Sequence, residues 1–360
     1  MFMKKNNEEQ VGFNSKLNMN QFPQSWVIPE LIPFNDIFYR NCYANSLFPI
    51  MKYYGKDILS ILVNDVLLYE FENGDIKIEK FSVNYFPVKS INDVITEEGL
   101  STSTIYRSDS IIKEIIASIS INRPVILWVD CFYESNRLDA FMKNHWPHTL
   151  LIHGFDNDNK VFDVIEHKFR DTLSYSKMKI SYDDIERSYK GFLDNFQSHF
   201  DTPTFHSYYS EDSSLENICE FHDPQLKYRN IYLLNYRENI ACVFEGLEKL
   251  KEFVSLFELA ASDKEFILDK SECILAILNN IVNAWNVQKH RVEELFADNG
   301  VFLEHINEII KDWSYVRAII AKYYYSQVFV EHFFDGAIRV LKGINEKEKQ
   351  FYNLLINTTQ

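Results

Sequence analysis

The last third of the sequence most narrowly limits what this chain can fold into. From about residue 238 onwards, apolar residues recur with the 3.6-residue period of a helix, and turn-forming residues are almost absent. The pattern covers residues 243–261, 272–296, 301–322 and 325–343. Long helices that each carry one apolar stripe are typical of a helical bundle. We therefore predict an all-helical domain over residues 238–360.

The residues before 238 follow a different pattern, in which short apolar runs alternate with helical segments and turns. Residues 149–153 and 161–166 are two such runs, and the turn-rich residues 154–160 between them predict a β-hairpin. The other predicted elements are helices over 41–55, 57–68 and 108–121, and strands over 76–81, 125–129 and 231–235. This pattern predicts an α+β domain over residues 31–237, preceded by an irregular leader over residues 1–30.

Charge and hydropathy exclude several classes of partner. The chain has 52 acidic and 37 basic residues and a formal net charge of -15, whereas nucleic-acid binding proteins need basic residues to neutralise phosphates. The longest apolar segments, 58–71 and 115–129, are interrupted by polar residues or proline, and a membrane span needs about 18 apolar residues in a row. The N-terminus has no apolar run of the kind a secretory signal requires. We expect a cytoplasmic protein with neither a nucleic-acid nor a membrane partner.

The five cysteines are widely spaced and contain no Cys-x-x-Cys pair: Cys42, Cys131, Cys219, Cys242 and Cys273. This spacing favours free thiols in a reducing compartment and predicts no metal site. Four of the five lie in apolar or helical runs, where a cysteine is usually a small buried hydrophobe. Cys42 differs because it opens a predicted helix, and the positive end of a helix lowers the pKa of a thiol.

A thiol site of the papain type needs a cysteine at a helix start, a histidine at the start of a later strand, and an oxygen-bearing side chain that orients the histidine. Cys42 satisfies the first requirement. His148 follows Pro147 and immediately precedes the strand predicted over 149–153. We predict that Cys42 is a nucleophile and that His148 is its base.

The third member of the site has two candidates on the second strand of the hairpin. Glu166 ends that strand and is assigned to orient the imidazole of His148. Asp163 is the alternative, but strand alternation places it on the face opposite to Glu166. Asp130 and His145 lie near the site in sequence, and each has either a structural role or a role beside the substrate.

Three segments together carry a resemblance to known families. The His148 segment, His-Thr-Leu-Leu-Ile-His-Gly-Phe-Asp, resembles the histidine region of bacteriocin-processing cysteine peptidases. Over roughly residues 35–235 the chain is still more similar to the N-terminal family of butirosin-biosynthesis protein H, and its helical part resembles the extension often fused to that family. The similarity rests on Cys42 in a helix that ends in Tyr-Gly, on Pro-Val-x-x-x-Val-Asp over 124–130, and on the hairpin after His148. The resemblance implies a papain-like cysteine protease fold followed by the helical domain.

The same resemblance implies a function in specialised metabolism, such as antibiotic biosynthesis. It implies an acyltransferase that moves an acyl or peptidyl chain from a carrier-protein thioester through a Cys acyl-enzyme to an amine acceptor, as in the amide-forming step of polythioamide (closthioamide-type) assembly. No cofactor or metal is expected beyond a substrate on a phosphopantetheinyl carrier protein. The alternatives are a peptidase that cleaves a leader or other peptide, and a catalytically silent papain-like protein that binds a metabolite or a carrier.

One departure from the peptidase pattern concerns the oxyanion donor. Those peptidases have a glutamine six residues before the cysteine, where this chain has Asp36. Asn35 or Asn41 could replace it, together with the backbone N–H of Cys42.

Overall fold

The structure, a computed structural model, describes residues 22–170, 172–199, 202–210 and 223–358. Its internal contacts divide the chain into two compact units. The first unit takes in residues 1–36, 41–58 and 95–215, and the second takes in 37–40, 59–94 and 216–360. Each unit is therefore assembled from separate stretches of the chain, whereas the sequence analysis placed one boundary near residue 238. Most of the expected leader lies outside the described residues.

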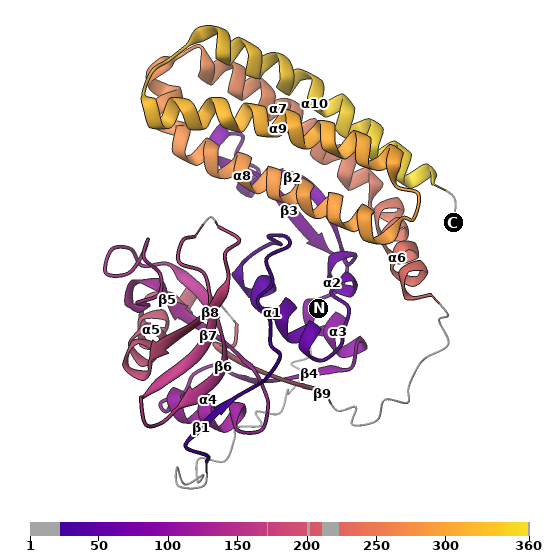
Figure 1. The fold of residues 1–360 in the computed structure, drawn as a ribbon. Coiled ribbons are helices and arrows are strands. Elements are labelled where there is room, and N and C mark those ends of the chain that lie inside the picture. The colour runs from indigo at the N-terminus through magenta and orange to yellow at the C-terminus, as the bar shows by residue number, and fades with distance from the viewer. Residues whose placement is uncertain (1–21, 171, 200–201, 211–222, 359–360) are drawn as a thin grey trace, which may run out of the picture. The chain divides into compact units, whose positions relative to one another are not determined.

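The described part of the first unit is built on a seven-stranded sheet with the order β4-β9-β5-β6-β7-β8, and with β1 beside β6 (Figure 1). All the paired strands run antiparallel. The strands are β1 Ser25–Val27, β4 Leu100–Ile105, β5 Val125–Asp130, β6 Pro147–Asp156, β7 Val161–Glu166, β8 Ser176–Ser181 and β9 Phe205–Ser210. The predicted hairpin of residues 149–153 and 161–166 is confirmed as β6 and β7.

Three helices of this unit matter for the site: α1 Cys42–Tyr53, α4 Ile111–Ile119 and α5 Tyr182–Asn195. Isoleucines of α4 and apolar residues of α5 share one buried core with the sheet. Helix α1 begins where the side chain of Asn41 accepts a hydrogen bond from the Ala44 N–H at 3.1 Å. It ends before Gly55, whose φ of 68° is the left-handed conformation that glycine adopts readily. The predicted helix over 41–55 is therefore confirmed.

Gly154 occupies a register irregularity in the pairing of β6 with β7. A Cβ atom at this position would lie 2.9 Å from Val27 and 3.0 Å from the Cβ of Asp163. The close approach of β1 and β7 to β6 therefore requires a glycine here.

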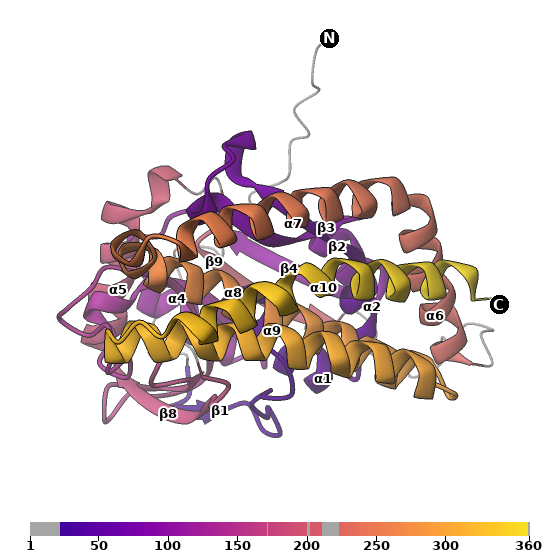
Figure 2. The same cartoon turned by 90° about the horizontal axis from the view of Figure 1, so that it is seen from above.

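The second unit joins a β-hairpin to long helices (Figures 1 and 2). The hairpin strands are β2 Asp65–Phe71 and β3 Phe81–Pro87, which pair antiparallel. The helices are α2 Leu59–Leu62, α6 Pro224–Glu238, α7 Ile240–Ala261, α8 Lys264–Leu295, α9 Gly300–Ser326 and α10 Glu331–Asn357, while α3 Ile91–Glu97 runs from this unit into the first. The predicted C-terminal helical region is confirmed, and the chain is a mixed α+β protein.

Buried polar contacts attach the hairpin to the helices within the second unit. The Tyr69 hydroxyl of β2 donates to Glu348 of α10 at 2.8 Å, and the Trp285 indole of α8 donates to Tyr69 at 3.2 Å. Asp65 forms a fully buried ion pair with Arg291 of α8. These contacts explain why residues 59–94 belong to the helical unit although they lie far from it in sequence.

Two predicted elements are wrong. The helix predicted over 57–68 gives way to the single turn of α2 and then to β2, because Val66, Tyr69 and Phe71 favour a strand and find a partner in β3. The strand predicted over 231–235 is the middle of α6, which Asp223 caps. In short apolar runs of this kind, periodicity alone cannot separate a strand from a helix. The strand predicted over 76–81 lies further along, as β3.

Among the residues that the structure describes, no helix is both long and apolar enough to cross a membrane.

Candidate active site

Cys42 is the first residue of α1 and is half-buried. The first N–H groups of a helix have no partner within the helix, and they give its N-terminus a partial positive charge. The side chain of Asn41 accepts a hydrogen bond from one of these groups, the N–H of Ala44. The backbone N–H of Cys42 is therefore well placed, by its position in the helix, to donate to an anion that forms beside the sulfur.

His148 at the start of β6 contacts both Cys42 and Glu166. Its Nε2 lies 2.9 Å from Oε2 of Glu166, and its ring hydrogen-bonds with the Cys42 thiol. Because Glu166 engages Nε2, the ring atom that serves Cys42 is Nδ1. The structure thus brings together the three residues that the sequence assigned to nucleophile, base and orienting acid. Thr149, the next residue of β6, also hydrogen-bonds to the sulfur.

The charges of this group support one another. Burial disfavours the imidazolium, but the negative charges of Glu166 and Cys42 outweigh burial and raise the pKa of His148 to about 10. Burial likewise disfavours the thiolate, but the charge of His148 and the hydrogen bonds from His148 and Thr149 lower the pKa of Cys42. Each group stabilises the charged form of the other, so the site favours a thiolate–imidazolium pair.

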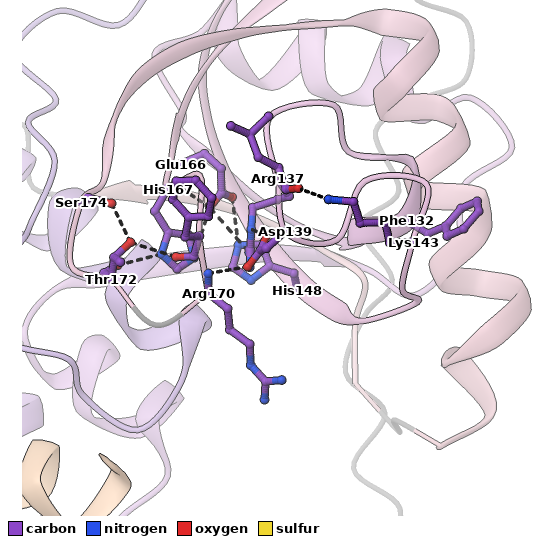
Figure 3. A network of polar contacts seen from close by, with 12 residues as sticks. Phe132, Arg137, Asp139, Lys143, His148, Glu166, His167, Arg170, Thr172 and Ser174 are labelled. Atoms are coloured by element: carbon purple, nitrogen blue, oxygen red, sulfur yellow. Dashed lines mark hydrogen bonds and ion pairs between the residues drawn. The ribbon is translucent and has the colours of Figure 1, made fainter. Parts of the chain in front are cut away.

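Glu166 is fully buried and is held from several sides (Figure 3). Its Oε1 accepts the backbone N–H of His167 at 2.7 Å and lies 3.9 Å from Nη1 of Arg137. Burial opposes its ionisation, but the charge of His148 and its hydrogen bond outweigh burial and lower the pKa of Glu166. The carboxylate that orients His148 is therefore ionised and fixed in place.

Three further residues surround Glu166 that no sequence pattern indicated. Arg137 and Glu134 come from the segment between β5 and β6, and His167 directly follows Glu166; all three are buried. Burial and the charge of Glu166 raise the pKa of Glu134 to about 8. The sequence carries no sign of their burial because the segment between β5 and β6 also contains other charged residues, Asp139 and Lys143, and only the fold shows that Glu134 and Arg137 turn inward.

Asp163, the alternative third member, lies elsewhere. It pairs with Lys179 of β8 at 3.1 Å and packs beside Gly154. The strand alternation that separated Asp163 from Glu166 therefore holds in the structure.

Asp130 and His145 form a second, separate pair. Nδ1 of His145 lies 2.6 Å from Oδ2 of Asp130, which also accepts a hydrogen bond from Asn195 of α5 at 3.0 Å. Oδ1 of Asp130 accepts the N–H of Phe132 and caps the turn that follows β5. Asp130 and His145 therefore link the turn after β5 to α5, and these contacts fit the structural alternative for the two residues.

The two candidate oxyanion donors differ in their availability. The Asn35 side chain makes two hydrogen bonds with the backbone of Tyr175. Its Nδ2 donates to the Tyr175 carbonyl at 3.0 Å, and its Oδ1 accepts from the Tyr175 N–H at 2.8 Å. Asn35 is thus used to fix the segment after Glu166. Asn41 adjoins Cys42 as the helix cap. Asp36, where the peptidases have glutamine, is exposed and lies 3.6 Å from Lys52.

No protein-family model matches this chain, and no curated protein matches it either.

Proposed function

We propose that this protein is a papain-like acyltransferase that uses Cys42 as its nucleophile and forms an amide bond. The observation that carries the proposal is the contact of His148 with both Cys42 and Glu166 at the N-terminus of α1. The helix start, the later strand that carries the histidine, and the acid on the next strand follow the order of a papain-type site.

In the first half of the proposed reaction, the Cys42 thiolate attacks the carbonyl carbon of an acyl or peptidyl thioester on a carrier protein. A bond forms between the sulfur and the carbonyl carbon, and the bond to the carrier's thiol breaks. His148 gives its Nδ1 proton to the departing thiolate, so that a carrier thiol and an acyl-enzyme result. The backbone N–H of Cys42 stabilises the negative oxygen that develops between these states.

In the second half, an amine attacks the same carbonyl carbon. Neutral His148 accepts a proton from the amine, the Cys42 thiolate leaves, and the amide departs with the acyl chain. The thiolate–imidazolium pair is then restored. Glu166 keeps Nε2 of His148 engaged throughout, so that Nδ1 faces the sulfur in both halves. No nucleotide is needed because the thioester already holds the energy for amide formation.

Intact-protein mass spectrometry after mixing with an acyl-loaded carrier protein tests this proposal. We expect an adduct of the acyl mass that is absent in Cys42→Ala and present in Cys242→Ala, which removes an exposed cysteine of α7. Adding an amine should then release the acyl chain as an amide.

Two other outcomes would replace the proposal. Release of the free acid in the presence of amine, together with cleavage of peptides, would favour the leader-cleaving peptidase. An unmodified Cys42 that reacts with alkylating agents like an ordinary thiol would favour a silent binding protein.

A further inference from the structure

The side chains behind Cys42 form a second grouping that the proposed reaction does not use. His148, Glu166 and His167 each offer one ligand atom, and these atoms all lie within 4.8 Å of one another. The three residues are almost completely buried, with exposed fractions of 5%, 0% and 2%. Figure 3 shows the three residues together, and the two imidazole rings stack with their centroids 5.5 Å apart.

The protonation of His167 follows from its hydrogen bond. Its Nδ1 lies 2.9 Å from the carbonyl oxygen of Thr172, and because a carbonyl only accepts, Nδ1 carries the proton. In the neutral ring, Nε2 then presents its lone pair. This atom has no hydrogen-bond partner among the described residues and lies 3.5 Å from Oε1 of Glu166. The lone pair of His167 Nε2 and the oxygen of Glu166 both accept, so neither can satisfy the other, whereas a cation between them would satisfy both.

The spacing of these atoms suits zinc. Tetrahedral zinc binds imidazole nitrogen and carboxylate oxygen at about 2.0–2.2 Å, which places neighbouring ligand atoms roughly 3.3–3.5 Å apart. Nε2 of His167 and Oε1 of Glu166 already have this separation, at 3.5 Å. Nε2 of His148 lies 2.9 Å from the other carboxylate oxygen, Oε2, so Glu166 would need to turn, or to bind through both oxygens, to share one ion with both imidazoles. Two imidazoles and one carboxylate are also a usual zinc ligand set.

We propose that His148, Glu166 and His167 form a zinc site that competes with the catalytic pair. When Zn²⁺ binds, Nε2 of His148 coordinates the ion and its proton passes to solvent. The ring keeps its Nδ1–H toward Cys42, but it is now fixed on the ion instead of being oriented by Glu166, and its proton transfer with the leaving thiol and the amine is slowed. This inhibitory consequence rests on the proposed function, whereas the binding of the ion does not.

Zinc titration of Cys42→Ala, followed by calorimetry and by competition with a chromophoric chelator, tests the site. Using this variant excludes coordination by the thiol. We expect one Zn²⁺ per chain, binding at least about tenfold weaker when His167→Gln is added, and unchanged binding when His145→Gln is added. His145 is the matched control because it is a histidine that pairs with Asp130, outside the grouping.

A second measurement protects the test against a folding defect in His167→Gln. Zinc should raise the melting temperature of Cys42→Ala, and that shift should vanish in Cys42→Ala with Glu166→Gln. The proposal is overturned if Cys42→Ala does not bind zinc, or if His167→Gln and Glu166→Gln leave the affinity and the shift unchanged. Because Cys42→Ala cannot form an acyl-enzyme, zinc binding and the proposed function succeed or fail separately.

Discussion

Two completely buried glutamates, Glu166 in the first unit and Glu348 in the second, have pKa values shifted in opposite directions. Glu166 in the first unit faces His148, His167 and Arg137, and its pKa is lowered. Glu348 in the second unit accepts hydrogen bonds from Tyr69 and Trp313, each at 2.8 Å. Burial outweighs these neutral donors and raises the pKa of Glu348 to about 8.

The difference shows that a buried carboxyl group needs cationic neighbours in order to stay ionised. Neutral donors bond one oxygen of Glu348, Oε1, without repaying the cost of burying a charge, so this group stays protonated and contributes to packing. Cationic neighbours keep Glu166 ionised, and an ionised group can orient an imidazolium. The same residue type is therefore structural in one unit and belongs to the candidate site in the other.

The largest expected effect comes from removing the charge of Glu166. Glu166→Gln should lower the rate of acyl transfer between about 10²- and 10⁴-fold, because the amide no longer stabilises the imidazolium or holds its Nε2–H. The rate of adduct formation at Cys42, measured by mass spectrometry, checks this. A loss of less than tenfold in a folded variant would mean that Glu166 does not orient His148.

Glu348 should matter for stability instead. Glu348→Ala leaves a cavity and two buried donors, on Tyr69 and Trp313, without an acceptor, and should cost about 3 kcal/mol of unfolding free energy. Glu348→Gln keeps an acceptor and should cost much less. Urea unfolding of the two variants measures both values, and equal losses would contradict a neutral Glu348.

The two glutamates should also give opposite dependences of stability on pH. In the folded protein the pKa of Glu348 is raised to about 8, above its ordinary value of 4.5. Its protonated form therefore favours the folded state at low pH, and that stability is lost as pH rises from about 4.5 to 8. Glu166, with a lowered pKa, contributes stability above pH 4.5 that is lost at lower pH. Unfolding curves between pH 5 and 8 should show a smaller decline of stability in Glu348→Gln than in the wild type, with the remainder due to Glu134, whose pKa is also raised to about 8. An equal decline in both proteins would contradict a protonated Glu348.

The smallest effect is expected at Asp163, the acid that shares β7 with Glu166. Asp163 is partly exposed and pairs with an exposed lysine, and ion pairs of this kind contribute little. Asp163→Asn should change the acylation rate by less than about twofold and stability by less than about 1 kcal/mol. A loss as large as that of Glu166→Gln would reverse the choice between the two acids.

The sequence allowed the site to be predicted better than the fold around it. Cys42, His148 and Glu166 could be found because each stands at the end of an element that local patterns define: a helix start, a strand start and a strand end. The long helices from α7 to α10 were predictable because their periodicity extends over many turns.

Elements whose form depends on distant partners could not be predicted in this way. Residues 65–71 become β2 only because β3 pairs with them and Tyr69 reaches Glu348, 279 residues away in sequence. Glu134, Arg137 and His167 lie in or beside connecting segments that carry no periodic pattern. They become buried around Glu166 because the segments that connect β5 to β6 and β7 to β8 fold back over this end of the sheet.

The central claim is that His148, oriented by Glu166, stabilises a thiolate at Cys42. The most direct test is the pH dependence of Cys42 alkylation by iodoacetamide, followed peptide by peptide in the wild type and in His148→Asn. The account predicts an inflection clearly below the ordinary thiol value of about 8.5 in the wild type, which moves back to that value in the variant. An inflection near 8.5 in both proteins would contradict it.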